Sequence, residues 1–170
     1  SHRMIKVYNK GIIIQSIWGR KWKFHWSQIE GVSEVRTRYK LFGIPIRTKY
    51  QAQLHPLDGK PIKLDRQIKD VEELCARIKA KIYPGLLQRY RAAFRGDDTI
   101  TFGPIKMNSY QIAINDRKIP WDQVSDIETK NGYLILKYDN KQRTKFPIKK
   151  IPNVEVMLQV LQESVMYGRT

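Results

Sequence analysis

The chain has a single cysteine, Cys75, among its 170 residues. One thiol excludes an internal disulfide and a multi-cysteine zinc site, and it fits a reducing compartment. The sequence also lacks an apolar run long enough to cross a bilayer, and its start shows no signal-peptide pattern. Ser1 and His2 before Met4 resemble the remnant of a removed tag, so the functional interpretation leaves these first residues out.

Sequence motifs of catalysis and metal binding are also missing. There is no glycine-rich phosphate loop, no nucleophile elbow and no H-E-x-x-H. Clustered carboxylates such as Asp97-Asp98 fall in turns or in first helical turns, where capping and the helix dipole explain them. The histidines have no metal-ligand spacing with one another: His2, His25 and His55. We therefore expect a protein that is not an enzyme and that needs no cofactor and no metal.

Acidic residues are scarce in the first half of the chain. Residues 1–95 carry 21 Lys and Arg against 7 Asp and Glu, a net +14, whereas residues 96–170 carry 11 against 9, a net +2. Within residues 1–57, Glu30 and Glu34 are the only acids. Such a one-sided field attracts polyanions and weakens as salt screens it. The alternative, a generally solvated basic surface, would spread the charge over both halves.

The sequence repeats one pattern. KFHWSQIEGV at 23–32 and KIPWDQVSDI at 118–127 place a Lys, a Trp and a Gln at the same spacing. Two helix starts also match, at 68–78 and 151–161, where Asp70 and Asn153 are the expected N-cap residues before Val-Glu. We interpret the chain as two copies of one unit, with domains at 5–95 and 96–170.

Within each copy, several short strands precede one helix. In the second copy we expect strands at 111–114, 118–121, 125–129, 133–138 and 144–148, with turns at 115–116, 131–132 and 139–140. In the first copy we expect strands at 5–8, 11–18 and 22–26, and then a hairpin over 50–64 that turns at Asp58-Gly59. The predicted fold class is α+β, mainly β, with each unit a small antiparallel barrel or sandwich capped by its C-terminal helix.

Apolar stripes at helical spacing define the two helices. The first helix has the stripe Val71, Leu74, Cys75, Ile78 and Ile82. Tyr83-Pro84-Gly85 is expected to break or kink it, and a second segment then resumes the pattern. The second helix has the stripe Val154, Met157, Leu158, Leu161 and Val165.

Three stretches resemble an uncharacterised family of bacterial domains: RYRAAFRGDDTITFGPIKM (89–107), KIPWDQVSDIETKNGYLILK (118–137) and IPNVEVMLQVL (151–161). The recurring marks of that family are a Phe-Gly-Pro strand, a Pro-Trp-Ser/Asp segment and an Ile-Pro-Asn-Val helix start. IKVYNKGIII and FHWSQIEGV are similar to its first half, so the resemblance covers nearly the whole chain. This sequence departs from the family in its much more basic first half.

The strand-rich unit closed by one helix also resembles bacterial pleckstrin-homology-like domains, here in tandem. No catalytic residue or ligand is implied by the family. A hydrophobic hairpin often precedes this region in similar members, which implies the soluble part of a membrane-anchored protein, at the cytoplasmic face of the membrane. The resemblance therefore implies an architecture and a location.

Two basic segments with flanking aromatic residues are the candidate binding sites, WGRKWK at 18–23 and RTRYKLFGIPIRTKY at 36–50. Hairpin loops at one open end of pleckstrin-homology-like units dock lipid head groups in many such domains, so the resemblance implies one shared rim. The expected residues for anionic lipid or phosphate are Arg20, Lys21, Lys23, Arg36, Arg38, Lys40, Arg47 and Lys49. The expected membrane-inserting tip is Leu41, Phe42 and Ile44, because apolar residues dip into the interface while cations hold head groups.

Other interpretations stay open. Leu41 and Phe42 can instead fold down as core, and the four tryptophans are more often packing residues than ligand platforms: Trp18, Trp22, Trp26 and Trp121. Nucleic acid is the alternative partner, because the basic residues are interleaved with aromatic ones, although no helix-turn-helix, zinc finger or RNP signature is present. A protein partner that adds a strand or helix at a sheet edge is a third candidate. The lipid species and the oligomeric state are not encoded in any pattern.

Overall fold

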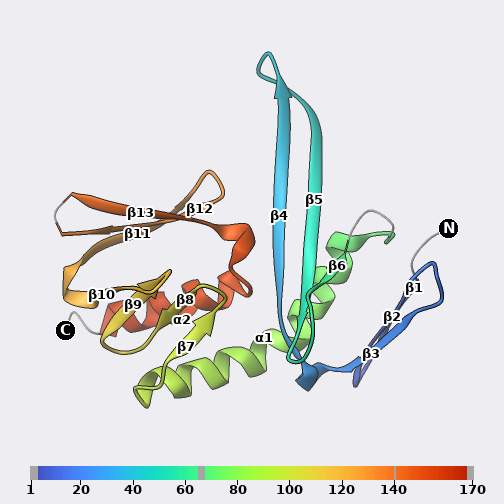
Figure 1. Cartoon of the computed structure of the whole chain (residues 1–170), viewed down its shortest axis with the longest axis horizontal. Coiled ribbons are helices and arrows are strands. Elements are labelled where there is room, and N and C mark those ends of the chain that lie inside the picture. The colour runs from blue at the N-terminus through green and yellow to red at the C-terminus, as the bar shows by residue number, and fades with distance from the viewer. Residues whose placement is uncertain (1–3, 65–67, 140, 168–170) are drawn as a thin grey trace. The chain divides into compact units, whose positions relative to one another are not determined.

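The structure is a computed structural model of the whole chain (Figure 1). It describes residues 4–64, 68–139 and 141–167, without the side chains of 37–39, 41, 46–47 and 164–167. The chain divides into two compact units, Ser1–Ile82 (unit 1) and Tyr83–Thr170 (unit 2). The described residues are mostly β, with thirteen strands and two α-helices, as the mainly β fold class predicts.

Unit 1 begins with an antiparallel sheet of three strands in the order β1 (Met4–Tyr8), β2 (Gly11–Gln15) and β3 (Lys21–His25). The short 3-10 helix η1 (Trp26–Gln28) leads into a second sheet of β4 (Ile29–Leu41), β5 (Ile44–Pro56) and β6 (Ile62–Leu64). Along β1 and β3 exposed residues alternate with half-buried ones, whereas β2 between them is mostly buried. The unit's buried strand residues include Ile12, Ile14, Val32, Leu54 and Leu64.

Helix α1 (Val71–Arg95) continues through Pro84, so of the break or kink predicted at 83–85 the break does not occur. Proline removes one backbone hydrogen bond from a helix. Ile78 and Ile82 before Pro84 and Leu86 after it are all buried. Their burial stabilises the helix on both sides of the proline and offsets the lost hydrogen bond. The sequence placed the whole helix with the first domain, whereas the residues from Tyr83 onward belong to unit 2.

Unit 2 has a four-stranded sheet in the order β10-β9-β8-β7 and a three-stranded sheet in the order β11-β12-β13. The first sheet contains β7 (Ile100–Phe102), β8 (Ile105–Met107), β9 (Gln111–Ile114) and β10 (Arg117–Pro120). After the 3-10 helix η2 (Trp121–Gln123), the second contains β11 (Val124–Lys130), β12 (Tyr133–Tyr138) and β13 (Gln142–Pro147). The 3-10 helix η3 (Ile148–Lys150) then precedes α2 (Val154–Tyr167).

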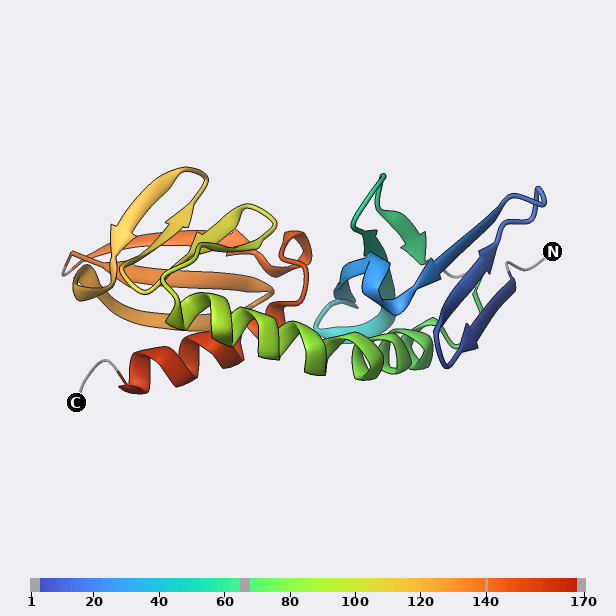
Figure 2. The same ribbon diagram turned by 90° about the horizontal axis from the view of Figure 1, so that it is seen from below.

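The core of unit 2 is shared by its sheets, by α2 and by the C-terminal half of α1. Phe102 is fully buried, and its ring meets Tyr90 of α1 edge-on, with the ring centroids 4.8 Å apart. Residues 83–95 of α1 lie beside α2 (Figure 2), where the Tyr83 hydroxyl donates to Glu155 at 2.7 Å. The buried face of α2 is wider than its predicted stripe, since Val156 and Val160 are buried as well as Met157 and Leu161.

The repeat inferred from sequence recurs in backbone geometry. In each unit the indole N–H of a tryptophan donates to an asparagine carbonyl, Trp26 to Asn9 at 2.8 Å and Trp121 to Asn108 at 2.7 Å. Both tryptophans begin a 3-10 helix and are half-buried. The expected N-cap positions also match, since Asp70 and Asn153 each have a positive φ and a carbonyl that accepts from the residue four positions on.

The strand pairings of the described residues leave every sheet open, so the barrel considered from the sequence does not form. Each unit passes from its first sheet to its second through a 3-10 helix. The register also shifts at the start of the next strand, at Ile29/Gly31 in β4 and at Val124/Asp126 in β11. Such bulges bend a strand and interrupt its pairing, which keeps the two sheets of each unit separate.

Candidate functional site

Strands β4 and β5 form a hairpin whose outer part, residues 36–50, is here named the distal hairpin. Strand β6 pairs only with residues 52–54 of β5, so the distal hairpin is a two-stranded ribbon. Phe42 lies six positions after Arg36, a length of about 20 Å in a strand. The ribbon therefore carries its tip well away from the rest of unit 1, as Figure 1 shows.

The base of the distal hairpin is fixed to α1 by a half-buried polar cluster. The Glu34 carboxylate accepts hydrogen bonds from the Tyr50 hydroxyl and from the Lys79 ammonium group. The Glu34 and Lys79 side chains are 21% and 20% exposed, so this ion pair is only partly screened by water. Burial raises the pKa of Tyr50, and its hydrogen bond to Glu34 raises that pKa further, so the hydroxyl stays a donor.

Arg36 is part of this attachment. Its guanidinium pairs with the Glu72 carboxylate in the first turn of α1, and it lies over the Tyr50 ring at 5.9 Å from the centroid. From the sequence, Arg36 is one of the residues expected to bind anionic lipid or phosphate. The structure gives it a partner at the base of the hairpin, because β4 passes the N-terminal end of α1.

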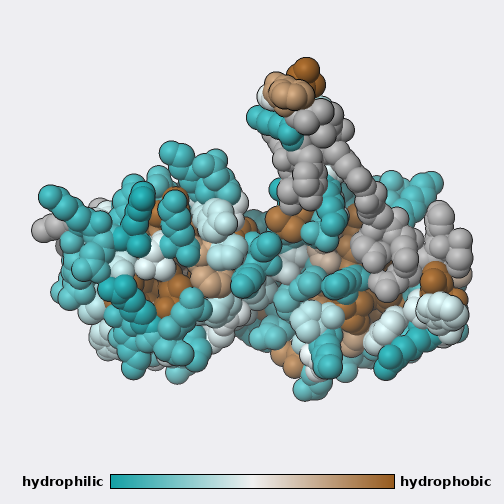
Figure 3. Space-filling view, turned by 45° about the horizontal axis from the view of Figure 1, so that its top comes forward, coloured by the Kyte–Doolittle hydropathy of each residue, from teal (hydrophilic) through white to brown (hydrophobic). Residues whose placement is uncertain are grey.

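The tip of the distal hairpin exposes apolar side chains. Phe42 is 96% exposed and Ile44 is 66% exposed, so the alternative in which Phe42 folds down as core is wrong. The space-filling view shows this apolar tip at the end of the ribbon (Figure 3). Lys40 is exposed and Lys49 is half-buried. The side chains of Leu41, Arg38 and Arg47 lie outside the described residues.

The backbone at the tip is a tight turn with two left-handed residues. Phe42 has φ 50° and Gly43 has φ 82°, the pattern of a type I′ turn. The turn at Asn131-Gly132 has the same geometry, with φ 53° and 78°. Asparagine and glycine tolerate positive φ, whereas a bulky residue there costs about 1–3 kcal/mol. Phe42 therefore holds an unfavourable backbone conformation while its side chain makes no core contact.

The second predicted basic segment lies on a different hairpin. Trp18 is 90% exposed in the turn between β2 and β3, so its interpretation as a packing residue is wrong. Gly19 has φ 79°, and its N–H donates to the Ser16 carbonyl at 3.1 Å, which closes a tight turn that points the indole outward. The Ser-x-x-Gly spacing was the available sequence signal for this turn.

The cations of this turn are exposed along β3 and the residue before it. Arg20 lies over the Trp22 ring at 5.5 Å from the centroid, and Lys21 and Lys23 point to solvent. Within unit 1, Figures 1 and 2 both place this turn apart from the tip of the distal hairpin. The structure therefore divides the predicted rim into two separate basic surfaces.

Titratable groups of the described chain form no metal-type cluster of three or more His, Cys, Asp or Glu. His55 of β5 pairs with the Ser33 hydroxyl of β4 through its Nε2, at 2.8 Å, and burial lowers its pKa. Cys75 is fully buried, and burial raises the pKa of its thiol to about 11. A buried thiol with a raised pKa is a packing residue, since reactivity needs the exposed thiolate.

Comparisons with known proteins identify one family. The model of a family of unknown function (DUF6585) matches residues 1–169. No curated protein sequence matches the chain. Across the parts of the chain that the structure describes, no helix is both long and apolar enough to span a bilayer.

Proposed function

The chain belongs to DUF6585, a family of unknown function, and from the geometry of unit 1 we propose that it is a non-catalytic module that docks on an anionic membrane surface through the tip of the distal hairpin. The observation that carries this proposal is Phe42. It is 96% exposed, and it occupies a left-handed turn position that other residues fill at lower cost. An aromatic side chain kept at such a position is accounted for by contact with something outside the chain.

The tip has the chemistry of a membrane wedge. Transfer of a Phe or Ile side chain from water to an apolar medium contributes about 1.5–3 kcal/mol. Phe42 and Ile44 together are then comparable with a single acyl anchor, which alone gives only marginal and reversible binding. Lys40 at the tip and Lys49 on the neighbouring strand add about 1 kcal/mol each at an anionic leaflet.

The fold of the units agrees with this role. Unit 2 has a four-stranded and a three-stranded antiparallel sheet followed by a helix, and unit 1 has two three-stranded sheets followed by a helix. This order of elements is similar to that of pleckstrin-homology-like domains, so we infer a tandem of such units. The expected location is the cytoplasmic face of a membrane.

Cosedimentation with vesicles tests the proposal. The full chain is mixed with vesicles of neutral lipid, or of neutral lipid with about 20 mol% phosphatidylserine, at low and at raised salt. We expect retention on the anionic vesicles, weakened by salt. Lys40→Glu with Lys49→Glu should lower the affinity by about 30-fold, from about 1 kcal/mol for each lost lysine.

The matched control is Lys145→Glu with Lys149→Glu, which removes two lysines of unit 2. Arg36→Glu is unsuitable, because it would place a carboxylate beside Glu72 and loosen the hairpin base. Equal binding to neutral vesicles, or equal losses for both double variants, would reject the tip. A gel shift with random DNA and RNA runs in parallel, and retention there alone would assign the basic surface to nucleic acid.

A further inference from the structure

The tip of the distal hairpin accounts for only one of the two basic surfaces of unit 1. The other, here named the sheet face, is the exposed side of the β1-β2-β3 sheet with the turn at 16–20 beside it. Its strand residues are Lys6, Tyr8, Lys21, Lys23 and His25. Residues 4–29 contain no Asp or Glu, and within the part of the chain that the structure describes no carboxylate pairs with these lysines. The sheet face therefore attracts anionic partners.

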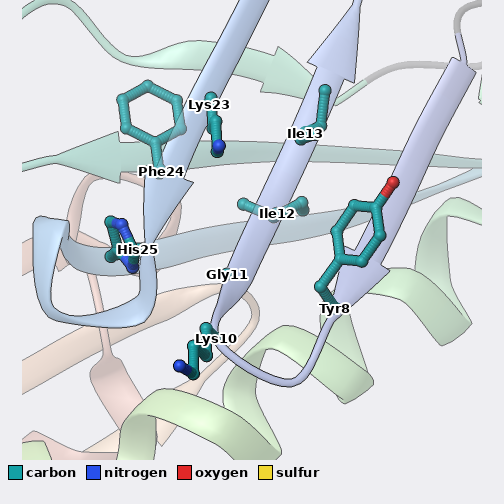
Figure 4. Close-up of a pocket in the computed structure, with 8 residues that line it drawn as sticks. All are labelled: Tyr8, Lys10, Gly11, Ile12, Ile13, Lys23, Phe24 and His25. Atoms are coloured by element: carbon teal, nitrogen blue, oxygen red, sulfur yellow. The ribbon is translucent and has the colours of Figure 1, made fainter.

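The strand register brings these side chains together on one side of the sheet. Lys6 and Lys23 lie in one row across β2, and Tyr8 and His25 lie in the next row. Lys21 lies two positions before Lys23, about 7 Å away along β3. Figure 4 shows Tyr8 on β1 and both Lys23 and His25 on β3, with β2 between them. The three lysines therefore share one face of the sheet.

Exposed rings lie at both ends of the sheet face. The Trp18 side chain, in the turn between β2 and β3, is 90% exposed. Tyr8 lies at the other end, beside the turn between β1 and β2, and is 49% exposed, and the His25 side chain is exposed in the same row. The length of β2 separates the two ends by about 14 Å. The lysines thus lie between the rings.

Hydrogen bonds fix the turn that carries Trp18. The Gly19 N–H donates to the Ser16 carbonyl at 3.1 Å, and the Ser16 N–H donates to the Arg20 carbonyl at 2.8 Å. The Arg20 N–H also donates to the Ser16 hydroxyl at 3.1 Å. A turn that is ordered before binding adds little entropic cost when a ligand contacts its side chain.

Rings at the ends and ammonium groups between them suit the chemistry of an unpaired nucleic-acid strand. The phosphates of such a strand pair with lysine ammonium groups, and its bases stack on aromatic rings. The bases of a duplex are stacked on one another, whereas those of a single strand have free faces. At the distal hairpin, by contrast, the exposed side chains of Phe42 and Ile44 gather at one protruding point. The broad sheet face fits an extended chain rather than a wedge into lipid.

We propose that the sheet face binds single-stranded nucleic acid, with a site of about four nucleotides. Bases stack on the rings of Trp18 and Tyr8. The ammonium groups of Lys6, Lys21 and Lys23 contact phosphates, which carry no sequence information, so the site accepts RNA and DNA of different sequences. This surface is separate from the tip of the distal hairpin, so this proposal and the membrane proposal can fail independently.

Fluorescence anisotropy tests the site with labelled oligo(U) and oligo(dT) of about 12 nucleotides and with a duplex of the same length. We expect the full chain to bind the single strands at least tenfold more tightly than the duplex. Lys21→Gln with Lys23→Gln should weaken binding of the single strands at least tenfold at about 0.1 M NaCl. The slope of log K against log salt should fall in magnitude by about 1.4, from about 0.7 for each lost phosphate contact.

The matched control is Lys40→Gln with Lys49→Gln, which removes the same charge from the distal hairpin. This control should bind the oligonucleotides like the unaltered chain and should lose affinity for anionic vesicles. The variant with Lys21→Gln and Lys23→Gln should show the opposite pattern, with vesicle binding retained. The two assays therefore distinguish failure of this proposal from failure of the membrane proposal.

Trp18→Ala tests the stacking contact. It should weaken binding of oligo(U) at least fivefold and remove most of the quenching of tryptophan fluorescence that the bound strand causes. Its Tm should equal that of the unaltered chain, because the side chain is exposed. Phe42→Ala is the control, since Phe42 is similarly exposed but lies on the distal hairpin, and it should leave oligonucleotide binding unchanged.

Four results would overturn the proposal. A duplex or heparin that binds as tightly as the single strands would indicate a diffuse attraction for polyanions. Equal losses of oligonucleotide binding in the two double lysine variants would have the same meaning. Loss of vesicle binding alone in the variant with Lys21→Gln and Lys23→Gln would assign the sheet face to lipid. An unchanged anisotropy with protein at about 100 µM and NaCl at about 50 mM would show that the face binds no single strand.

Discussion

At the scale of single residues, Phe42 connects a local conformational cost to a proposed contact. Asparagine is the residue that a left-handed turn position favours, as at Asn131 in the matching turn of unit 2. Phe42→Asn should therefore keep or raise the Tm while lowering the affinity for anionic vesicles about tenfold, from the loss of an apolar side chain worth about 1.5–3 kcal/mol. Thermal unfolding and vesicle cosedimentation measure the two effects.

Tyr133→Asn is the control for that experiment. Tyr133 is an aromatic residue, 44% exposed, that follows the Asn131-Gly132 turn. Its replacement should leave vesicle binding unchanged. A Phe42→Asn chain that loses stability together with binding would mean that Phe42 supports the hairpin itself.

His55 should make the stability of unit 1 depend on pH. Burial lowers the pKa of His55 in the folded state. As the pH falls, this histidine therefore binds a proton in the unfolded chain before it does so in the folded chain. The stability is complete above the unfolded pKa of about 6.5 and is lost as pH falls from there through the folded pKa. Urea unfolding at about pH 8 and at about pH 5.5 should show this fall, and His55→Gln should reduce it.

His25, which is exposed in β3, is the matched control. His25→Gln should retain the pH dependence of the unaltered chain. If His55→Gln and the unaltered chain lose stability equally between these pH values, the fall in the free energy of unfolding comes from the carboxylates and not from His55.

At the scale of elements, the distal hairpin is held to α1 by the Glu34, Tyr50 and Lys79 cluster. Cys75 is the only cysteine, it is fully buried, and Tyr50 lies beside it. A thiol reagent can reach Cys75 only when this part of unit 1 opens. Tyr50→Ala should therefore raise the rate of Cys75 labelling by about tenfold or more, through loss of cover and of a hydrogen bond worth about 1.5–3 kcal/mol to a charged group.

Stopped reactions with a chromogenic thiol reagent measure that rate. Tyr110→Ala in unit 2 removes an exposed tyrosine and should leave it unchanged. Equal rates for Tyr50→Ala and the unaltered chain would show that the hairpin base does not cover the thiol.

The same elements show how far the sequence predicted the fold. The strands at 111–114 and 133–138 and the turn at Asn131-Gly132 are where the pattern placed them, because alternation and turn chemistry are local. The strands at 100–102 and 105–107 were not found from the residue pattern, since three residues are too few to show a period; the family resemblance alone gave a strand there, at Phe-Gly-Pro. The run through Pro84 was missed because burial at distant positions outweighs a local helix breaker.

The candidate site was less predictable for the same reason. The sequence indicated an apolar tip that includes Phe42 and Ile44. It could not indicate whether that tip is exposed or folded into the core, because the residue types are the same in both cases. The pairing of Arg36 with Glu72 joins residues far apart in the chain, so no local pattern marks it. The exposure of Trp18 depends on one tight turn, whereas composition alone favours burial of tryptophan.

At the scale of the whole molecule, the net charge of +16 acts on stability and on binding in opposite directions. Self-repulsion of like charges destabilises the compact state. Raising NaCl from about 20 mM to about 300 mM should therefore raise the Tm by a few degrees and, through the same screening, weaken vesicle binding. A Tm that falls over this range would mean that specific ion pairs outweigh the repulsion.

The unbroken course of α1 has a practical consequence for anyone who wishes to express the units separately. A boundary between Ile82 and Tyr83 would divide the continuous helix α1. Each fragment would then lose the backbone hydrogen bonds that the helix makes across this boundary. Truncations should instead keep residues 71–95 intact in both products, so that the two recombinant pieces overlap in sequence rather than abut.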